Sequence, residues 1–170
     1  MSKTAAAKLY ERDFYTWALT QVQALRRGLV NELDLENLAE EVEDMARSEV
    51  RELDSRLQVL LAQLLKWAYE PDGRSKSWRL TLKEQRLQVR KLLRQNPGLR
   101  PKTGEILRDA YEGARVQAAK ETPLDESDFP LECPWTFERS IEDGFLPDAP
   151  VAGGNGGRKS TARRQGRQRA

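Results

Sequence analysis

The sequence contains no histidine, and it has one cysteine in 170 residues. Without histidine, the chain cannot use histidine-based acid–base catalysis, histidine-dependent nucleophiles or metal sites that need imidazole ligands. One cysteine excludes an intramolecular disulfide and a cysteine-only zinc site. No apolar run approaches the roughly 20 residues needed to span a bilayer, and the N-terminus lacks a signal-peptide core. We therefore expect a cytoplasmic protein with no membrane association, no cofactor and no catalytic residue.

Charge is abundant and segregated along the chain. Charged residues make up 33% of the sequence, and the net charge is +2. The last 22 residues contain six basic residues and no acidic one, which leaves 23 basic against 27 acidic residues in 1–148, a net charge of −4. A segment so poor in large apolar residues cannot order itself, so we predict a disordered basic tail over 148–170. Its basic residues, which could bind nucleic acid through counterion release or merely aid solubility, are Arg158, Lys159, Arg163, Arg164, Arg167 and Arg169.

Apolar residues recur at three- and four-residue steps, which predicts an all-α fold without strands. Asp34 and Ser77 are candidate N-caps, Gly28 is a candidate C-terminal stop, and Pro101 is suited to the first position of a helix. We expect a single helical domain over 8–147 after a flexible N-terminus, 1–7. The predicted helices cover 11–27, 35–67, 78–95, the segment from Pro101 to Thr122–Pro123, and 135–143.

The second of these helices dominates the prediction. One apolar stripe continues from Leu35 to Trp67, which corresponds to a helix about 50 Å long at 1.5 Å per residue. We expect a bundle built on this helix, with a short C-terminal helix completing it. Any part of the stripe that the bundle leaves uncovered would also suit a homodimer.

The aromatic residues and the thiol are expected to have structural roles. Tryptophans can serve as stacking platforms, but here all four lie on helix faces that are predicted to point into the core. Cys133 has no basic neighbour in the sequence that would activate it as a nucleophile. The four tryptophans are Trp17, Trp67, Trp78 and Trp135.

A cluster of carboxylates in the long helix is the candidate metal site. Glu40, Glu41 and Asp44 fall near one another on a helical wheel, and Mg²⁺ prefers oxygen ligands. Their spacing loosely resembles the EExxE motif of helical nucleotide pyrophosphohydrolases. Those enzymes need a second ExxD on a facing helix, and Glu105 and Asp109 have the wrong spacing for it. A solvated helix face is therefore the preferred interpretation, favoured by the helix dipole.

A basic stripe on the third predicted helix is the candidate anion site. Its residues step by four, three, four and four positions, so they share one face of the helix. We favour pairing of this stripe with the acidic face of the long helix; the alternatives are solvation and binding of nucleic acid or another anion. The stripe consists of Arg79, Lys83, Arg86, Arg90 and Arg94.

Several short motifs occur in a characteristic order along the chain: Tyr10-Glu11-x-Asp13-Phe14-Tyr15-x-Trp17, Leu38-Ala39-Glu40-Glu41-Val42-Glu43, Leu64-Leu65-Lys66-Trp67, Ser77-Trp78, Gln85-Arg86, Asn96-Pro97-Gly98-Leu99, Ala110-Tyr111 and Phe129-Pro130-x-x-Cys133-Pro134-Trp135. Over about residues 8–147, this order resembles a bacterial family of domains of unknown function, DUF29. The family implies a compact, mainly helical domain and brings no established activity. Its members usually carry a histidine where this chain has Gln63, which we expect to pack in the bundle as a hydrogen-bonded polar group.

Three functional hypotheses follow from these features. The leading one is a non-enzymatic interaction or accessory module with a protein partner, because the sequence shows no catalytic constellation. The second is nucleic-acid binding through the basic stripe and the basic tail. The third is a magnesium-dependent nucleotide hydrolase that uses Glu40, Glu41 and Asp44.

Overall fold

The computed structural model describes the backbone of residues 3–148 and the side chains of residues 8–148, and this part of the chain is helical and has no strand. The predicted all-α fold, the long helix and the short C-terminal helix are confirmed. The predicted basic tail lies, from residue 149 on, outside the described residues. The helices are α1 (Lys3–Arg12), α2 (Phe14–Arg27), α3 (Leu35–Tyr69), α4 (Lys76–Gln95), α5 (Thr103–Glu121) and α6 (Phe137–Ile141), with 3₁₀ turns η1 (Val30–Glu32), η2 (Pro71–Gly73), η3 (Pro97–Lys102) and η4 (Glu126–Asp128).

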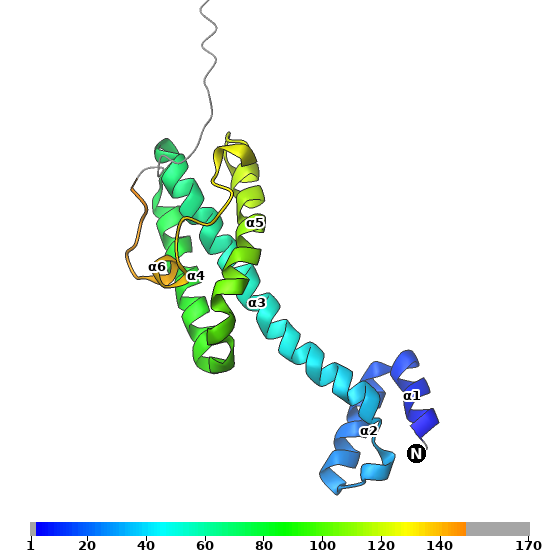
Figure 1. Ribbon diagram of the computed structural model, residues 1–170. Coiled ribbons are helices and arrows are strands. Elements are labelled where there is room, and N and C mark those ends of the chain that lie inside the picture. The colour runs from blue at the N-terminus through cyan, green and yellow to red at the C-terminus, as the bar shows by residue number, and fades with distance from the viewer. Residues whose placement is uncertain (1–2, 149–170) are drawn as a thin grey trace, which may run out of the picture.

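Helix α3 joins two separate lobes (Figure 1). Its C-terminal half packs with α4, α5 and α6, which together form the bundle lobe. Its N-terminal half, residues 35–49, projects beyond the bundle and is called the arm below (Figure 1). Helices α1 and α2 and the turn η1 form the N-terminal lobe at the far end of the arm. The predicted apolar stripe thus runs along one helix, of which one half packs in the bundle lobe and the other half projects beyond it.

The core of the bundle lobe begins at Leu53, the first fully buried leucine of α3. From there the leucines of the stripe lie between α4 and α5, where their burial contributes to the apolar core that stabilises the lobe. Helix α5 faces α3 with three small residues, Ala110, Ala114 and Ala118, none more than 1% exposed. Because these side chains are short, the two helices approach closely.

The first predicted helix, 11–27, is divided in the structure. The side chain of Asp13 accepts a hydrogen bond from the backbone N–H of Thr16 at 3.0 Å and so begins α2 at Phe14. A separate helix, α1, precedes it and includes residues 3–7, which were expected to be a flexible terminus. The periodicity argument missed α1 because its alanines favour a helix without marking an apolar face.

Three helix ends differ from the predictions, and one is confirmed. Ser75, not Ser77, caps α4, since its side chain accepts the N–H of Trp78. Pro101 lies within η3, so α5 begins two residues later than expected. Helix α6 is shorter than the predicted 135–143, and Thr136 caps it. Gly28 ends α2 in the left-handed conformation at φ 69°, where glycine has no steric penalty.

Candidate functional site

A buried polar joint fixes the N-terminal lobe to the start of α3. The side chain of Trp17 is 2% exposed, and its indole N–H donates to Asp34 Oδ2 at 3.2 Å. Gln21 Oε1 accepts the backbone N–H of Asp34 at 2.8 Å, and Asn37 Nδ2 donates to the Asp34 carboxylate at 2.7 Å. Asp34 therefore stands at the predicted N-cap position, but its side chain bonds side chains of the joint and no N–H of the first turn of α3.

A second contact ties α1 to the arm. The phenol of Tyr10 donates a hydrogen bond to Glu41 Oε1 at 2.6 Å. This bond, together with partial burial and the neighbouring carboxylates, raises the pKa of Tyr10 to about 12 because a phenolate beside Glu41 would be unfavourable. Glu41 thus serves as an acceptor that orients the N-terminal lobe.

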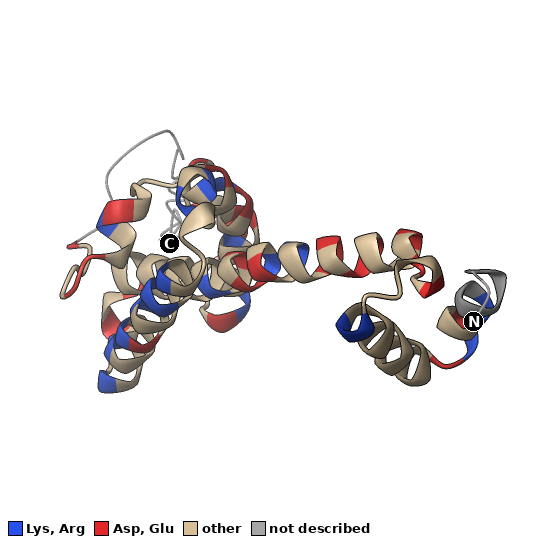
Figure 2. Cartoon of the chain, turned by 90° about the horizontal axis from the view of Figure 1, so that it is seen from below, with Lys and Arg blue, Asp and Glu red and all other residues tan. Residues whose placement is uncertain are grey.

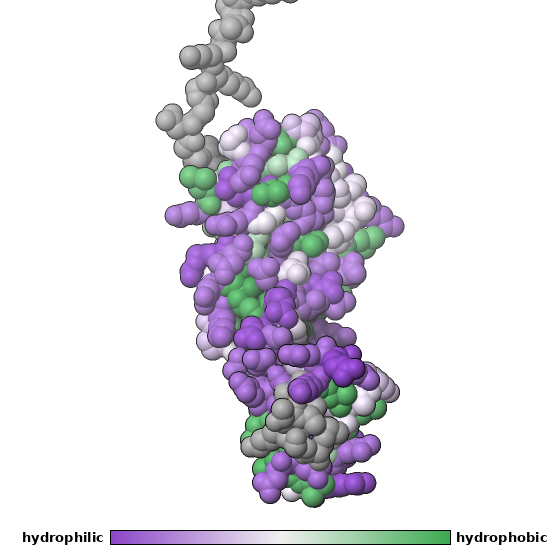
Figure 3. Space-filling view, turned by 90° about the vertical axis from the view of Figure 1, so that its right-hand side faces the viewer, coloured by the Kyte–Doolittle hydropathy of each residue, from purple (hydrophilic) through white to green (hydrophobic). Residues whose placement is uncertain are grey.

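The N-terminal lobe and the arm expose an unusual number of large apolar side chains. In the described part of the chain, ten of the fourteen exposed large hydrophobic residues lie within residues 14–45. Hydrophobic residues are visible on the surface of this lobe at the lower end of Figure 3. We call these ten residues the apolar surface; they are Phe14, Tyr15, Leu19, Val22, Leu25, Leu29, Val30, Leu35, Val42 and Met45, at 39–73% exposure.

Most large apolar residues of α2 are exposed, although their spacing is typical of one buried helix face. Phe14, Val22 and Leu25 recur at helical spacing with Trp17, yet only Trp17 of these four is buried. The sequence did contain a sign of this. Helix α2 has apolar residues on more than one face and no charge before Arg26, a composition typical of a helix that is covered on several sides. In the structure, the N-terminal lobe covers only one side of α2, so most of its large apolar side chains are exposed.

The candidate metal ligands lie on the arm, where acidic residues follow one another (Figure 2). Glu40 and Asp44 are exposed; Glu41 accepts from Tyr10, and Asp44 pairs with Arg47 at 2.6 Å. Among the described residues, no group of three or more acidic or cysteine side chains is arranged to hold a metal ion. The magnesium hypothesis stays a prediction without support from this geometry.

The basic stripe of α4 is only partly free. Arg86 is 3% exposed and donates to the carbonyl oxygens of Ser140 and Phe145 at 3.0 and 2.7 Å. Arg90 donates to the Ile141 carbonyl and pairs with Asp143 at 2.8 Å. The other members of the stripe, which are exposed, are Arg79, Lys83 and Arg94.

The prediction that this stripe pairs with the acidic face of α3 is therefore wrong, because its two partly or fully buried arginines contact a different segment. The partner of Arg86 and Arg90 is the segment 140–145, which comprises the end of α6 and the residues after it. Helix α4 runs back along α3 only as far as Glu49, where Asn96 Nδ2 donates to the carboxylate at 2.8 Å. The acidic arm extends beyond the reach of α4, which the sequence could not reveal.

Replacing Arg86 by alanine is expected to loosen the segment 140–145. Two charge-assisted hydrogen bonds would be lost and two carbonyls left without a donor, which costs about 2–3 kcal/mol of unfolding free energy. Urea unfolding measures the loss. Arg94→Ala, an exposed substitution on the same helix, should change stability by less than about 0.5 kcal/mol. Equal effects of the two would show that the Arg86 bonds do not hold the segment.

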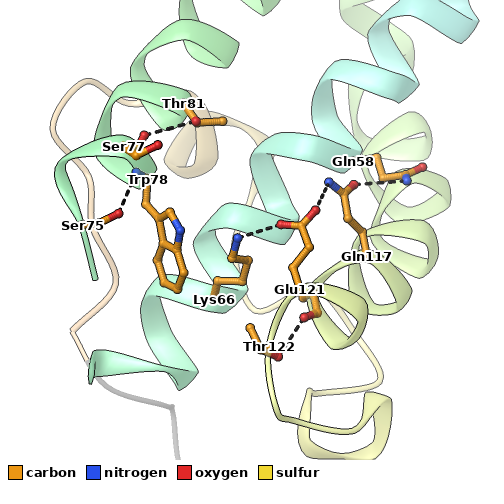
Figure 4. Close-up of polar contacts among 10 residues, drawn as sticks. Gln58, Lys66, Ser75, Ser77, Trp78, Thr81, Gln117, Glu121 and Thr122 are labelled. Atoms are coloured by element: carbon orange, nitrogen blue, oxygen red, sulfur yellow. Dashed lines mark hydrogen bonds and ion pairs between the residues drawn. The ribbon is translucent and has the colours of Figure 1, made fainter. Parts of the chain in front are cut away.

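A buried lysine is the main polar feature of the bundle lobe (Figure 4). Lys66 is 4% exposed; its ammonium bonds Glu121 Oε2 at 2.7 Å and lies 4.3 Å from the centre of the Trp78 ring. Gln117 also donates to Glu121, at 3.0 Å. Burial alone would raise the pKa of Glu121, but the bonds from Lys66 and Gln117 and the lysine charge outweigh it and lower the pKa. The ion pair is thus a structural link between α3 and α5.

The prediction that all four tryptophans pack in the core is confirmed only in part. Trp17 is buried, whereas Trp67, Trp78 and Trp135 are half-buried. Trp78 covers Lys66, the Arg74 guanidinium lies 5.2 Å from the centre of the Trp67 ring, and Trp135 packs against the bundle core. Gln63 is buried as expected, but its side-chain oxygen has no hydrogen-bond partner, in contrast to the prediction.

A hollow of about 540 Å³ lies between α5 and residues 131–138. Tyr111 lines it and donates its hydroxyl to the Pro130 carbonyl at 2.9 Å. Cys133 also lines it, and its thiol donates to the Trp135 carbonyl at 3.3 Å. Burial raises the pKa of the Cys133 thiol, so at neutral pH it is less nucleophilic than a free cysteine, in line with the prediction. These groups hold the segment after α5 in place.

The remaining predicted site residues belong to the basic tail, which lies outside the described residues. In the part of the chain that the structure does describe, no helix combines the length and the apolar character required for a membrane crossing.

Comparison with known proteins identifies one family. No curated protein and no solved structure matches the chain significantly. The model of the domain of unknown function DUF29 matches residues 9–146, which is most of the chain. The core residues of the bundle lobe and the polar joint at Trp17 both lie within this range. The chain therefore belongs to the DUF29 family.

Proposed function

We propose that the protein is a non-enzymatic interaction module that binds a partner helix on its apolar surface. The observation that carries this proposal is the concentration of exposed large apolar residues within 14–45. The bundle lobe buries most of its large apolar residues and exposes four of the fourteen, so the excess of exposed apolar residues belongs to residues 14–45. An exposed apolar patch of this kind typically marks a site of protein–protein contact.

The size of the surface suits a stable complex. A large apolar side chain presents on the order of 150 Å² when nothing covers it, so ten of them at the observed exposures present on the order of 800 Å². A standard interface buries about 800 Å² per partner. The summed exposed area of the ten residues is therefore comparable to one side of a specific interface.

Charge indicates what kind of partner binds. Residues 35–46 of the arm contain five acidic residues and no basic one. A second copy of the chain would bring two such arms together and would be opposed by their repulsion. A basic amphipathic helix would cover the apolar residues and pair with the acidic ones. We therefore favour a basic helical partner over a homodimer.

The test is binding of two synthetic peptides to the full chain. Both form an amphipathic helix with one leucine face; the other face is lysine in one and glutamate in the other. We expect the lysine peptide to bind and the glutamate peptide to bind at least 10-fold more weakly. Val42→Gln with Met45→Gln removes two exposed residues, at 63% and 69%, and should weaken lysine-peptide binding about 10-fold.

The matched control is Leu80→Gln with Leu131→Gln, which removes two exposed leucines on the bundle lobe. This variant should bind the lysine peptide as the unaltered chain does. No binding of the lysine peptide, or equal loss in both variants, would refute the proposal. So would a dimer in sedimentation experiments that Val42→Gln with Met45→Gln dissociates, because the occupant would then be a second copy.

A further inference from the structure

A second surface, on the bundle lobe, has an excess of positive charge around a hollow. The hollow measures about 460 Å³ and lies between α4 and the residues that follow α6. Four cationic side chains line it against one carboxylate, with two leucines on its wall. The lining residues are Arg79, Lys83, Arg86, Leu87, Arg90, Asp143, Gly144 and Leu146.

Arg86 carries a buried charge that no carboxylate bonds directly. Its hydrogen bonds go to two carbonyl oxygens, and its carboxylate neighbours, Asp143 and Glu142, act on it only at longer range. Burial lowers the pKa of Arg86, which shows that its surroundings disfavour the charge. Burying a charge without a counterion is unfavourable, and an anion in the hollow would offset that cost.

The neighbouring cations are available to such an anion. Arg79 and Lys83 lie four residues apart on the same face of α4 and are exposed. Neither forms an ion pair among the residues that the structure describes. The single acid of the hollow, Asp143, is already paired with Arg90 at 2.8 Å. The positive charge of Arg79 and Lys83 is therefore uncompensated.

We infer that this hollow binds a small ligand that carries a phosphate or diphosphate group. Arg79 and Lys83 would contact the phosphate oxygens, since guanidinium and ammonium groups are the usual donors to phosphate. Leu87 and Leu146 would contact the apolar or planar remainder of the ligand. The observations for this site are independent of the apolar surface at the other end of α3.

A small ligand fits better than a nucleic-acid backbone. The volume of the hollow is in the range of small-molecule sites, and the segment 143–146 forms one of its walls. A continuous phosphate backbone would also meet Asp143, which is 76% exposed at its side chain, and a domain whose net charge is −4 over residues 1–148. Nucleic acid remains a distinct outcome of the test.

The experiment is calorimetric titration of the full chain with inorganic pyrophosphate, with adenosine diphosphate and with a 20-nucleotide single-stranded RNA. Pyrophosphate and the nucleotide should bind saturably, and the nucleotide more tightly because it also reaches Leu87. Arg79→Ala with Lys83→Ala should weaken both at least 10-fold. Lys91→Ala with Arg94→Ala removes the same charge from exposed positions of α4 outside the hollow and should change affinity less than threefold.

Leu87→Asn provides a second criterion. It should weaken the nucleotide severalfold and leave pyrophosphate unchanged. Three results would overturn the inference: no saturable binding of either phosphate probe, equal losses in the two charge variants, or RNA binding that is tighter than nucleotide binding and depends on Arg79 and Lys83. The last would assign the hollow to nucleic acid.

Discussion

Replacing Trp17 by alanine is expected to unfold the N-terminal lobe and leave the bundle lobe folded. Trp17 is the largest buried side chain of the lobe, and its ring centre lies 4.8 Å from that of Tyr10 and 5.5 Å from that of Phe14. Truncation of a buried tryptophan costs about 3–5 kcal/mol. It also leaves the Asp34 carboxylate without its indole donor. Because the N-terminal lobe is small, we expect this loss of unfolding free energy to unfold it.

Hydrogen exchange of backbone amides measures the result in each lobe separately. We expect amides of α2 to lose protection in Trp17→Ala, while amides around Leu57 to Leu65 of α3 keep theirs. Tyr15→Ala is the control, because Tyr15 is an aromatic residue of the same helix at 73% exposure. Equal loss of protection in both lobes would mean that they unfold as one cooperative unit. Unchanged protection of α2 would contradict the role of the polar joint.

Replacing Glu121 by alanine is expected to destabilise the bundle lobe by about 3 kcal/mol. The reason is an asymmetry in burial: the side chain of Lys66 is 6% exposed, whereas that of Glu121 is 38% exposed. Without Glu121, the lysine charge stays inside the lobe beside the Trp78 ring. Lys66→Met instead leaves a carboxylate that water can reach, and its unbranched side chain fills a similar volume. We therefore expect Lys66→Met to cost no more than about 1.5 kcal/mol.

The pH dependence of stability follows from the lowered pKa of Glu121. In the folded protein this carboxyl stays ionised below its ordinary pKa, near 4.5, because Lys66 and Gln117 bond it. Its contribution is fully present above about 4.5 and is lost as the pH falls through the folded-state pKa. The stability difference between the unaltered chain and Glu121→Ala should thus shrink in urea titrations as the pH falls below about 4.5. A difference that does not change with pH would contradict this account.

The two proposed sites can be tested independently because they lie on different lobes. Val42→Gln with Met45→Gln alters the arm and should not change pyrophosphate binding. Arg79→Ala with Lys83→Ala alters α4 and should not change binding of the lysine peptide. Loss of both activities in one variant would show instead that the variant is misfolded.

Much of the fold was readable from the sequence. The three- and four-residue spacing from Leu35 to Trp67 predicted α3, and the prolines, glycines and capping residues located α2, α4, α5 and α6 within a few residues, whereas α1 was missed. The missing histidines and the single thiol exclude whole classes of catalytic site by composition alone. These properties are local, so periodicity and composition determine them.

Only the tertiary structure determines which helix faces are covered by other parts of the chain. The stripe of α3 looks uniform in the sequence, yet Leu57 is fully buried and Val42 is 63% exposed, because α4 and α5 reach back only as far as the middle of the helix. Likewise, Arg86 and Arg79 share one face of α4, but only Arg86 lies beneath the segment 140–145. Periodicity determines which residues share a face of a helix; whether that face meets protein or water depends on chain segments distant in sequence.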